Sequence, residues 1–255
     1  MSAEGCHYRA TLAYDGTHYQ GFQRQVGDTP TIQLAVEKAI TTVTGQPVTI
    51  IGAGRTDTGV HASGQVIAFT VQWRHTEADL LRAINANLAA DIALQDMVCQ
   101  PGFHPRFDAL SRVYHYRIVQ ASQRQPLLSR YAWQIRYDLD VEAMQAAADL
   151  LIGEHDCATF GKPPQGENTV RVIMVSQWTK QAAPYGFDLS YRIEATAFLQ
   201  HMVRRVVGML TDVGRGAQTV AQFEAAFHEA KLAQAVTVAP PQGLTLEAVR
   251  YPANQ

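Results

Sequence analysis

Residues 48–71 read VTIIGAGRTDTGVHASGQVIAFTV and divide into three parts. Residues 48–53 and 65–71 are apolar and rich in β-branched side chains, which is typical of strands. Residues 54–61 between them are polar, with Gly54 and Gly59 allowing sharp turns and close backbone approach. A dense set of polar side chains on a loop between two strands is a frequent place for function.

The same alternation continues on both sides of this stretch. Further strands are predicted at residues 7–14, 92–99, 113–119, 169–179, 187–197 and 244–251. Helices are predicted after Thr29-Pro30, after the pairs Thr76/Asp79 and Thr219/Gln222, after Asp140, and over residues 199–213. The strand lengths favour antiparallel pairing. We therefore predict an α+β fold of two similar halves around a central cleft, with helices on one side.

Pro101, Gly102 and Pro105 mark the predicted boundary between the halves. The N-terminal half then covers residues 7–105 and the C-terminal half residues 106–252. A cleft between two such halves is the natural place for a site.

Composition indicates a soluble protein of the cytoplasm. The chain has 255 residues, of which 47% are apolar and 17% charged, without an apolar run long enough to cross a bilayer. Its N-terminus lacks the basic and apolar regions of a signal peptide. Cys6, Cys99 and Cys157 are widely spaced and odd in number, which predicts free thiols in a reducing compartment.

Charge is distributed unevenly along the chain. The formal net charge of −2 argues against a protein that coats nucleic acid non-specifically. Residues 106–137, however, contain six arginines and one acid, Asp108, with aromatic side chains between them. Arginine binds phosphate and aromatic faces stack on unpaired bases, so this region fits an RNA surface. An alternative is a strand pair with tyrosines in the core and arginines in solvent.

Several kinds of active site are disfavoured. The nine histidines show no metal-ligand spacing, and the chain has neither a phosphate-binding loop nor a Gly-x-Ser-x-Gly elbow. This argues against a metal site, a nucleotide cofactor and a serine nucleophile. Within residues 54–61, Asp57 is the candidate for chemistry. The alternative for Asp57 is an Asx turn paired with Arg55.

Residues 54–62 (GRTDTGVHA) resemble the signature of the tRNA pseudouridine synthase A (TruA) family. Other stretches resemble the same family in the expected order: 14–16 (YDG) with 21–25 (GFQRQ), 103–107 (FHPRF) leading to 112–116 (RVYHY), 198–208 (FLQHMVRRVVG) and 239–252. Cys157 and Ala89 differ from the residues common in the family, phenylalanine and proline, but lie outside the catalytic motifs.

This resemblance implies an isomerase that converts uridines 38, 39 and 40 of the tRNA anticodon stem-loop to pseudouridine without cofactor or metal. It also implies a homodimer on which one tRNA spans both subunits. Carried over onto the matching motifs, Asp57 is the catalytic aspartate, Tyr114 packs on the target base and Arg204 faces the aspartate. Arg55 contacts the RNA backbone or takes the space left by the flipped base.

These roles are physically consistent. A carboxylate that acts as nucleophile or base must be ionised, and a nearby guanidinium favours that form. Flipping a base out of its stack costs a few kcal/mol, of which one aromatic contact offsets about 1–3 kcal/mol.

Two other classes of function remain as alternatives. One is a non-catalytic RNA-binding module that uses residues 106–136. The other is an N-glycoside hydrolase, which needs a second carboxylate near Asp57, and Asp15 is the candidate.

Overall fold

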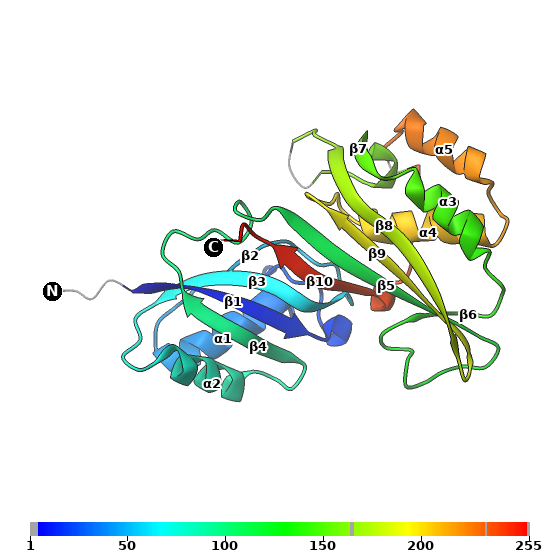
Figure 1. Cartoon of the computed structure of the whole chain (residues 1–255). Coiled ribbons are helices and arrows are strands. Elements are labelled where there is room, and N and C mark those ends of the chain that lie inside the picture. Colours follow the sequence, from blue (N-terminus) through cyan, green and yellow to red (C-terminus); the bar gives the residue numbers. More distant parts are fainter. Residues whose placement is uncertain (1–4, 164–165, 233, 254–255) are drawn as a thin grey trace. The chain divides into compact units, whose positions relative to one another are not determined.

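Two compact units make up the chain. A computed structural model describes residues 5–163, 166–232 and 234–253. Unit 1 contains residues 1–110 and 246–255, and unit 2 contains residues 111–245. Each unit combines helices with strands that pair mainly antiparallel (Figure 1). The predicted α+β class is therefore confirmed.

Unit 1 is built on strands whose order in the sheet differs from their order in the chain. They are β1 (Cys6–Tyr14), β2 (Ile51–Gly52), β3 (His61–Val71), β4 (Ile92–Cys99) and most of β10 (Leu244–Arg250). Their order is β4-β1-β3-β10, and β2 pairs with β3. In β1, Ala10 lies opposite Ile67 of β3 and Met97 of β4. Successive side chains of a strand point to opposite faces of the sheet, and the alternate residues of β1 that include Ala10 and Leu12 are buried in the core.

Helices α1 (Ile32–Thr44) and α2 (Glu77–Asn87) pack against each other on one side of these strands (Figure 1). Their apolar faces are buried: Val36 and Ile40 of α1, and Leu80 and Ile84 of α2, have no exposed surface. This spacing of three and four residues is the amphipathic period expected of surface helices.

The two helix starts agree with the sequence to different degrees. Thr76 and Asp79 form the predicted capping box at the start of α2. The predicted cap of α1 is wrong: Thr31, not Thr29, caps it, and its Oγ1 accepts a hydrogen bond from Leu34 N at 3.3 Å. The reason is that the carbonyl of Pro30 accepts a bond from Gln20 N at 2.8 Å, which keeps that residue outside the helix.

The strand predicted over residues 48–53 is shorter than expected, since only Ile51–Gly52 forms β2. The backbone of Ile50 bonds to side chains of α1 instead of a strand. Its N–H donates to Glu37 Oε1 at 3.1 Å, and its carbonyl accepts from Gln33 Nε2 at 3.2 Å. At this position, hydrogen bonds to side chains take the place of the hydrogen bonds between neighbouring strands.

Unit 2 has its own set of strands. They are β5 (Ser111–Ala121), β6 (Trp133–Ile135), β7 (Gly153–Asp156), β8 (Val170–Ala183) and β9 (Gly186–Ala195). Their order is β5-β9-β8-β7, and β6 pairs with β5 in parallel. β8 and β9 form a long hairpin that turns at residues 184–185, between the strands predicted over residues 169–179 and 187–197.

Three helices, α3 (Val141–Asp149), α4 (Met202–Gly214) and α5 (Val220–Glu229), pack together in unit 2 (Figure 1). Asp140 caps α3 and the Thr219/Gln222 pair forms a capping box on α5, which confirms both predictions. The helix α4 is nearly all buried, with Val206 and Leu210 fully enclosed. Short 3₁₀ helices lie at η1 (Gly16–His18), η2 (Ala158–Phe160) and η3 (Pro241–Gly243).

The prediction of three free thiols is wrong for two of the cysteines. Cys6 and Cys99 form a disulfide between β1 and β4, with their Cα atoms 6.0 Å apart. Antiparallel pairing of these strands brings together residues that lie 93 positions apart in the chain. Cys157 is free and buried, and burial raises the pKa of its thiol to about 12. Within the described parts of the chain, no helix is both long and apolar enough to span a bilayer.

Candidate active site

Asp57 lies on a tight loop between β2 and β3, residues 53–60, which we call the Asp57 loop. Ala53 N donates to Val66 O at 2.8 Å, so the loop leaves the sheet from a paired residue. Val60 N donates to Asp57 O at 3.1 Å and closes a turn at residues 58–59. Gly59 has a φ of 75°, a conformation that favours glycine. Asp57 is partly exposed in this turn.

Buried side chains support the loop from the core. Thr56 is buried, and its Oγ1 shares a hydrogen bond of 2.8 Å with the hydroxyl of Tyr14. Burial raises the pKa of Tyr14 to about 12, so this hydroxyl stays protonated. Gln65 of β3 is fully buried and its Nε2 donates to Gly54 O at 2.9 Å. These contacts fix the backbone on the N-terminal side of Asp57.

A second segment, residues 19–22, clamps the loop from the side. Phe22 N donates to Thr56 O at 3.0 Å, and Gly59 N donates to Tyr19 O at 3.3 Å. Gly21 has a φ of 83°, and a methyl group added to its Cα would lie 2.8 Å from Thr56 O. The two backbones therefore approach each other more closely than a side chain at position 21 permits.

Arg55 is exposed on the same loop, two residues before Asp57. Its Nε donates to the side-chain oxygen of Gln23 at 3.1 Å. Gln23 belongs to the motif at residues 21–25, so two motifs distant in the chain meet through this bond.

Asp15 has a structural role beside the Asp57 loop. It caps η1 by accepting from Thr17 N at 3.0 Å. Its Oδ1 also lies 3.1 Å from Nδ1 of the buried His61. Gly16 N donates to the same ring nitrogen at 3.0 Å. The bond from Gly16 N ties η1, which follows β1, to the start of β3.

Tyr114 lies on β5 of unit 2, opposite Ile193 of β9. Its side chain is 8% exposed, and its ring packs edge-on against Phe198 with centroids 5.1 Å apart. Tyr116, two residues further, lies on the same face of the strand and is fully buried. The hydroxyl of Tyr116 donates to Pro240 O at 2.8 Å, and burial raises its pKa well above the usual range.

Arg204 lies in the first turn of α4 and is half-buried. Its Nε donates to Ala239 O at 2.8 Å, and Ala239 N donates back to Arg204 O at 2.9 Å. The positive charge of Arg204 also lowers the pKa of Tyr116, against the larger opposite effect of burial. The segment before β10 therefore holds this guanidinium in place.

The structure thus assigns the four predicted residues to two units. Arg55 and Asp57 share one loop of unit 1, whereas Tyr114 and Arg204 belong to β5 and α4 of unit 2.

The sequence of residues 106–137 allowed two interpretations: an RNA surface, or a strand pair with tyrosines in the core and arginines in solvent. The structure agrees with each of them in part. Tyr114 and Tyr116 are core residues, as the second interpretation expects. Arg117 binds Asp188 with Nε–Oδ1 and Nη2–Oδ2 distances of 2.7 and 2.9 Å, and this contact lowers the pKa of Asp188. The remaining exposed members are Arg106, Arg124, Arg130, Arg136, Phe107, Tyr131 and Tyr137.

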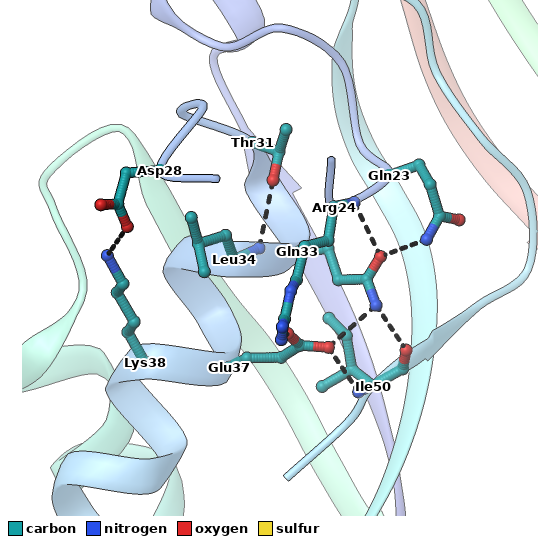
Figure 2. Close-up of polar contacts among 9 residues, drawn as sticks. All are labelled: Gln23, Arg24, Asp28, Thr31, Gln33, Leu34, Glu37, Lys38 and Ile50. Atoms are coloured by element: carbon teal, nitrogen blue, oxygen red, sulfur yellow. Dashed lines mark hydrogen bonds and ion pairs between the residues drawn. The ribbon is translucent and has the colours of Figure 1, made fainter. Parts of the chain in front are cut away.

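Two polar residues of the core of unit 1, Gln33 and Glu37, went unnoticed in the sequence. They are only 6% and 4% exposed and lie four residues apart on one side of α1 (Figure 2). Their spacing, adjoining the apolar stripe that includes Val36 and Ile40, is the signal that sequence reasoning had available. Among the described residues, no three His, Cys, Asp or Glu side chains gather closely enough to hold a metal ion.

Comparison with known proteins defines the class of this chain. A family model described as tRNA pseudouridine synthase matches residues 10–108 and 147–252. The chain is 39% identical over 253 residues to tRNA pseudouridine synthase A of Neisseria gonorrhoeae, covering 98% of this chain and 94% of that one. It is 43% identical over 246 residues to the protein of the same name from Chloroflexus aurantiacus, covering 94% and 87%. The corresponding protein of Pseudothermotoga lettingae is 38% identical over 246 residues, with coverage of 96% and 99%.

These matches identify an isomerase with a pseudouridine synthase fold. The chain belongs to the tRNA pseudouridine synthase family, as the resemblance in its motifs predicts.

Proposed function

We propose that this chain converts uridines 38, 39 and 40 of the tRNA anticodon stem-loop to pseudouridine, without cofactor or metal, and that Asp57 is its catalytic nucleophile or base. The strongest support is the match to the family model over residues 10–108 and 147–252. The first of these stretches includes Asp57. Further support comes from the Asp57 loop, where a partly exposed carboxylate stands on a backbone held by Tyr14, Gln65 and Phe22. Such preorganisation is what a positioned catalytic group requires.

The reaction rearranges one bond. The N1–C1′ bond of the target uridine breaks, the uracil turns, and C5 bonds to C1′. The proton on C5 leaves to solvent and N1 takes up a proton, so atoms and electrons balance without an external reactant. Asp57 either attacks C1′ or removes a proton from the ribose, and both routes need its ionised form.

The other three residues have supporting roles in this proposal. By the family resemblance, Arg204 has the role of the cation that favours the charged form of the catalytic carboxylate, and Tyr114 that of packing on the target base. Arg55 contacts the RNA backbone or fills the space that the flipped base leaves. The exposed arginines of residues 106–137 supply contacts to phosphate. The proposal includes a homodimer that works in the cytoplasm on tRNA, and light scattering of the pure protein tests the dimer.

A direct test uses the pure protein, unmodified tRNA transcripts labelled with tritium at C5 of uridine, and a chelator in the buffer. We expect tritium release, and we expect sequencing to locate pseudouridine at positions 38–40. Asp57→Asn should bind tRNA as the parent does and release no tritium. Release by a folded Asp57→Asn variant refutes the role of Asp57. A parent protein that binds tRNA without any release is a binding module instead.

A further inference from the structure

A buried carboxylate in α1 is the starting point of a polar chain that leads to the Asp57 loop. Glu37 is 4% exposed, and carboxylates are rarely buried unless they are paired. Its Oε1 accepts from Gln33 Nε2 at 2.8 Å and from Ile50 N at 3.1 Å, and its Oε2 accepts from Arg24 Nη1 at 3.1 Å (Figure 2). These donors compensate the charge for its loss of water.

The carboxylate dictates how the next residue is oriented. Glu37 only accepts, so Gln33 must turn its NH₂ group toward it. The oxygen of Gln33 then faces the opposite way, where it accepts from Gln23 Nε2 at 2.7 Å and from Arg24 N at 2.9 Å (Figure 2). The amide of Gln33 is therefore bonded at both ends inside the protein.

Two routes lead from Gln33 to the loop, and only the first depends on the orientation of the amide. Gln23 donates its NH₂ to Gln33, so its oxygen is left to accept from Arg55 Nε at 3.1 Å. The backbone provides the second route, because Gln33 N donates to Phe22 O at 2.9 Å and Phe22 N donates to Thr56 O at 3.0 Å. We call Glu37, Gln33 and Gln23 the Glu37 network.

We propose that Gln33, oriented by Glu37, is a positioning residue for the proposed reaction. Through the side chain of Gln23 it holds Arg55 on the Asp57 loop, whereas the main-chain bond from Gln33 N to Phe22 O does not depend on the side chain at position 33. Gln33 itself touches neither the reacting atoms nor the RNA. This inference rests on the proposed function, since the positioning matters only if Asp57 and Arg55 act on tRNA.

The test replaces Gln33 by leucine, which has a similar size but removes both ends of the amide. The partners Arg24 N, Gln23 Nε2 and Ile50 O then lose a bond each. We expect faster hydrogen exchange at residues 19–25 and 54–61, and a kcat lowered about tenfold to a hundredfold. The Kd for tRNA should change much less than kcat, because the exposed phosphate contacts outside the Asp57 loop remain.

Lys38→Met is the matched control on the same helix. Lys38 pairs with Asp28 at 3.8 Å, and both side chains are exposed, at 66% and 98% (Figure 2). A pair of this kind contributes little to stability, so hydrogen exchange and kcat should equal those of the parent.

A double-mutant cycle separates positioning from general destabilisation. Gln23→Leu and Arg55→Leu should each lower kcat, and their combination should be little worse than Arg55→Leu alone, since Gln23 acts through Arg55. Independent, multiplying effects contradict this route.

Glu37→Gln provides a second variant in case Gln33→Leu does not fold. It keeps an acceptor for Ile50 N and removes the charge, so the same changes should appear in smaller size. Normal exchange at residues 54–61 together with a normal kcat, in folded variants of both positions, overturns the inference. If the parent forms no pseudouridine, the proposed function fails, and hydrogen exchange alone decides whether Gln33 holds the loop.

Discussion

Replacing Gly208 by alanine has two opposite effects on the stability of α4: a gain in helix propensity and a steric clash with Thr237. Gly208 is buried in the middle of this helix, where alanine is intrinsically favoured over glycine by about 1 kcal/mol. A methyl group on its Cα, however, lies 2.1 Å from the carbonyl oxygen of Thr237 and 2.7 Å from the carbonyl carbon. Since such atoms keep about 3 Å or more between them, one backbone must shift by about 1 Å.

The segment that must move is held to α4 on both sides of the clash. Thr237 Oγ1 donates to Asp212 Oδ2 at 2.6 Å, and Ala239 O accepts from Arg204 Nε at 2.8 Å. Overpacking a core costs about 1–3 kcal/mol, and this fixed backbone favours the upper part of that range. After subtracting the gain in helix propensity, we expect Gly208→Ala to lower the free energy of unfolding by about 1–2 kcal/mol. The melting temperature should fall by about 3–6 °C.

Thermal unfolding followed by circular dichroism measures this difference. Gly214→Ala, at the end of the same helix, is the matched control. Its methyl group meets the flexible Met144 side chain, with Sδ 2.5 Å away, so it should cost less than Gly208→Ala. Because Ala239 bonds to Arg204, the folded Gly208→Ala protein should also form pseudouridine more slowly. A Gly208→Ala protein that melts at or above the parent temperature refutes this reasoning, since helix propensity then dominates.

Three further predictions concern the two units. Tyr114→Phe should retain most of the tritium release and Tyr114→Ala should lose most of it, because stacking uses the ring face; equal, negligible losses place Tyr114 in the scaffold alone. Asp188→Asn should cost about 1 kcal/mol at pH 7, after allowing for partial exposure of its pair with Arg117. The lowered pKa of Asp188 means that this contribution is present above the ordinary aspartate pKa and is lost as pH falls through the lower folded-state value. Urea unfolding should therefore show the difference between parent and variant shrink as the pH is lowered below about 4; a difference that does not shrink contradicts the ion pair as its source. The affinity for tRNA should fall steeply with salt in filter binding, and a flat response argues against the exposed arginines as phosphate contacts.

Features whose partners lie close by in the chain are predictable from the order of residues alone. The capping boxes Thr76/Asp79 and Thr219/Gln222 join residues three positions apart, so their residue types suffice to recognise them. The start of α1 shows the limit of such local signals. Thr29 and Thr31 are equally good caps by type, and a bond from Gln20 to the carbonyl of Pro30 selects the second.

The disulfide depended on pairing between distant segments. Cys6 and Cys99 have no recognisable spacing, and they meet because β1 and β4 are neighbours in the sheet. An antiparallel register is set by the burial of alternate side chains along whole strands, which single residues do not reveal.

For the candidate site, the motifs in the sequence predict Asp57, Arg55, Tyr114 and Arg204, because their residue types and order resemble those of the family. How the loop around Asp57 is supported became visible only in three dimensions. Glu37 and Gln33 look like ordinary polar positions of an amphipathic helix, yet they are buried and bonded to Ile50 and Gln23. Polar groups that lose water must find partners, and folding brings those partners from elsewhere in the chain.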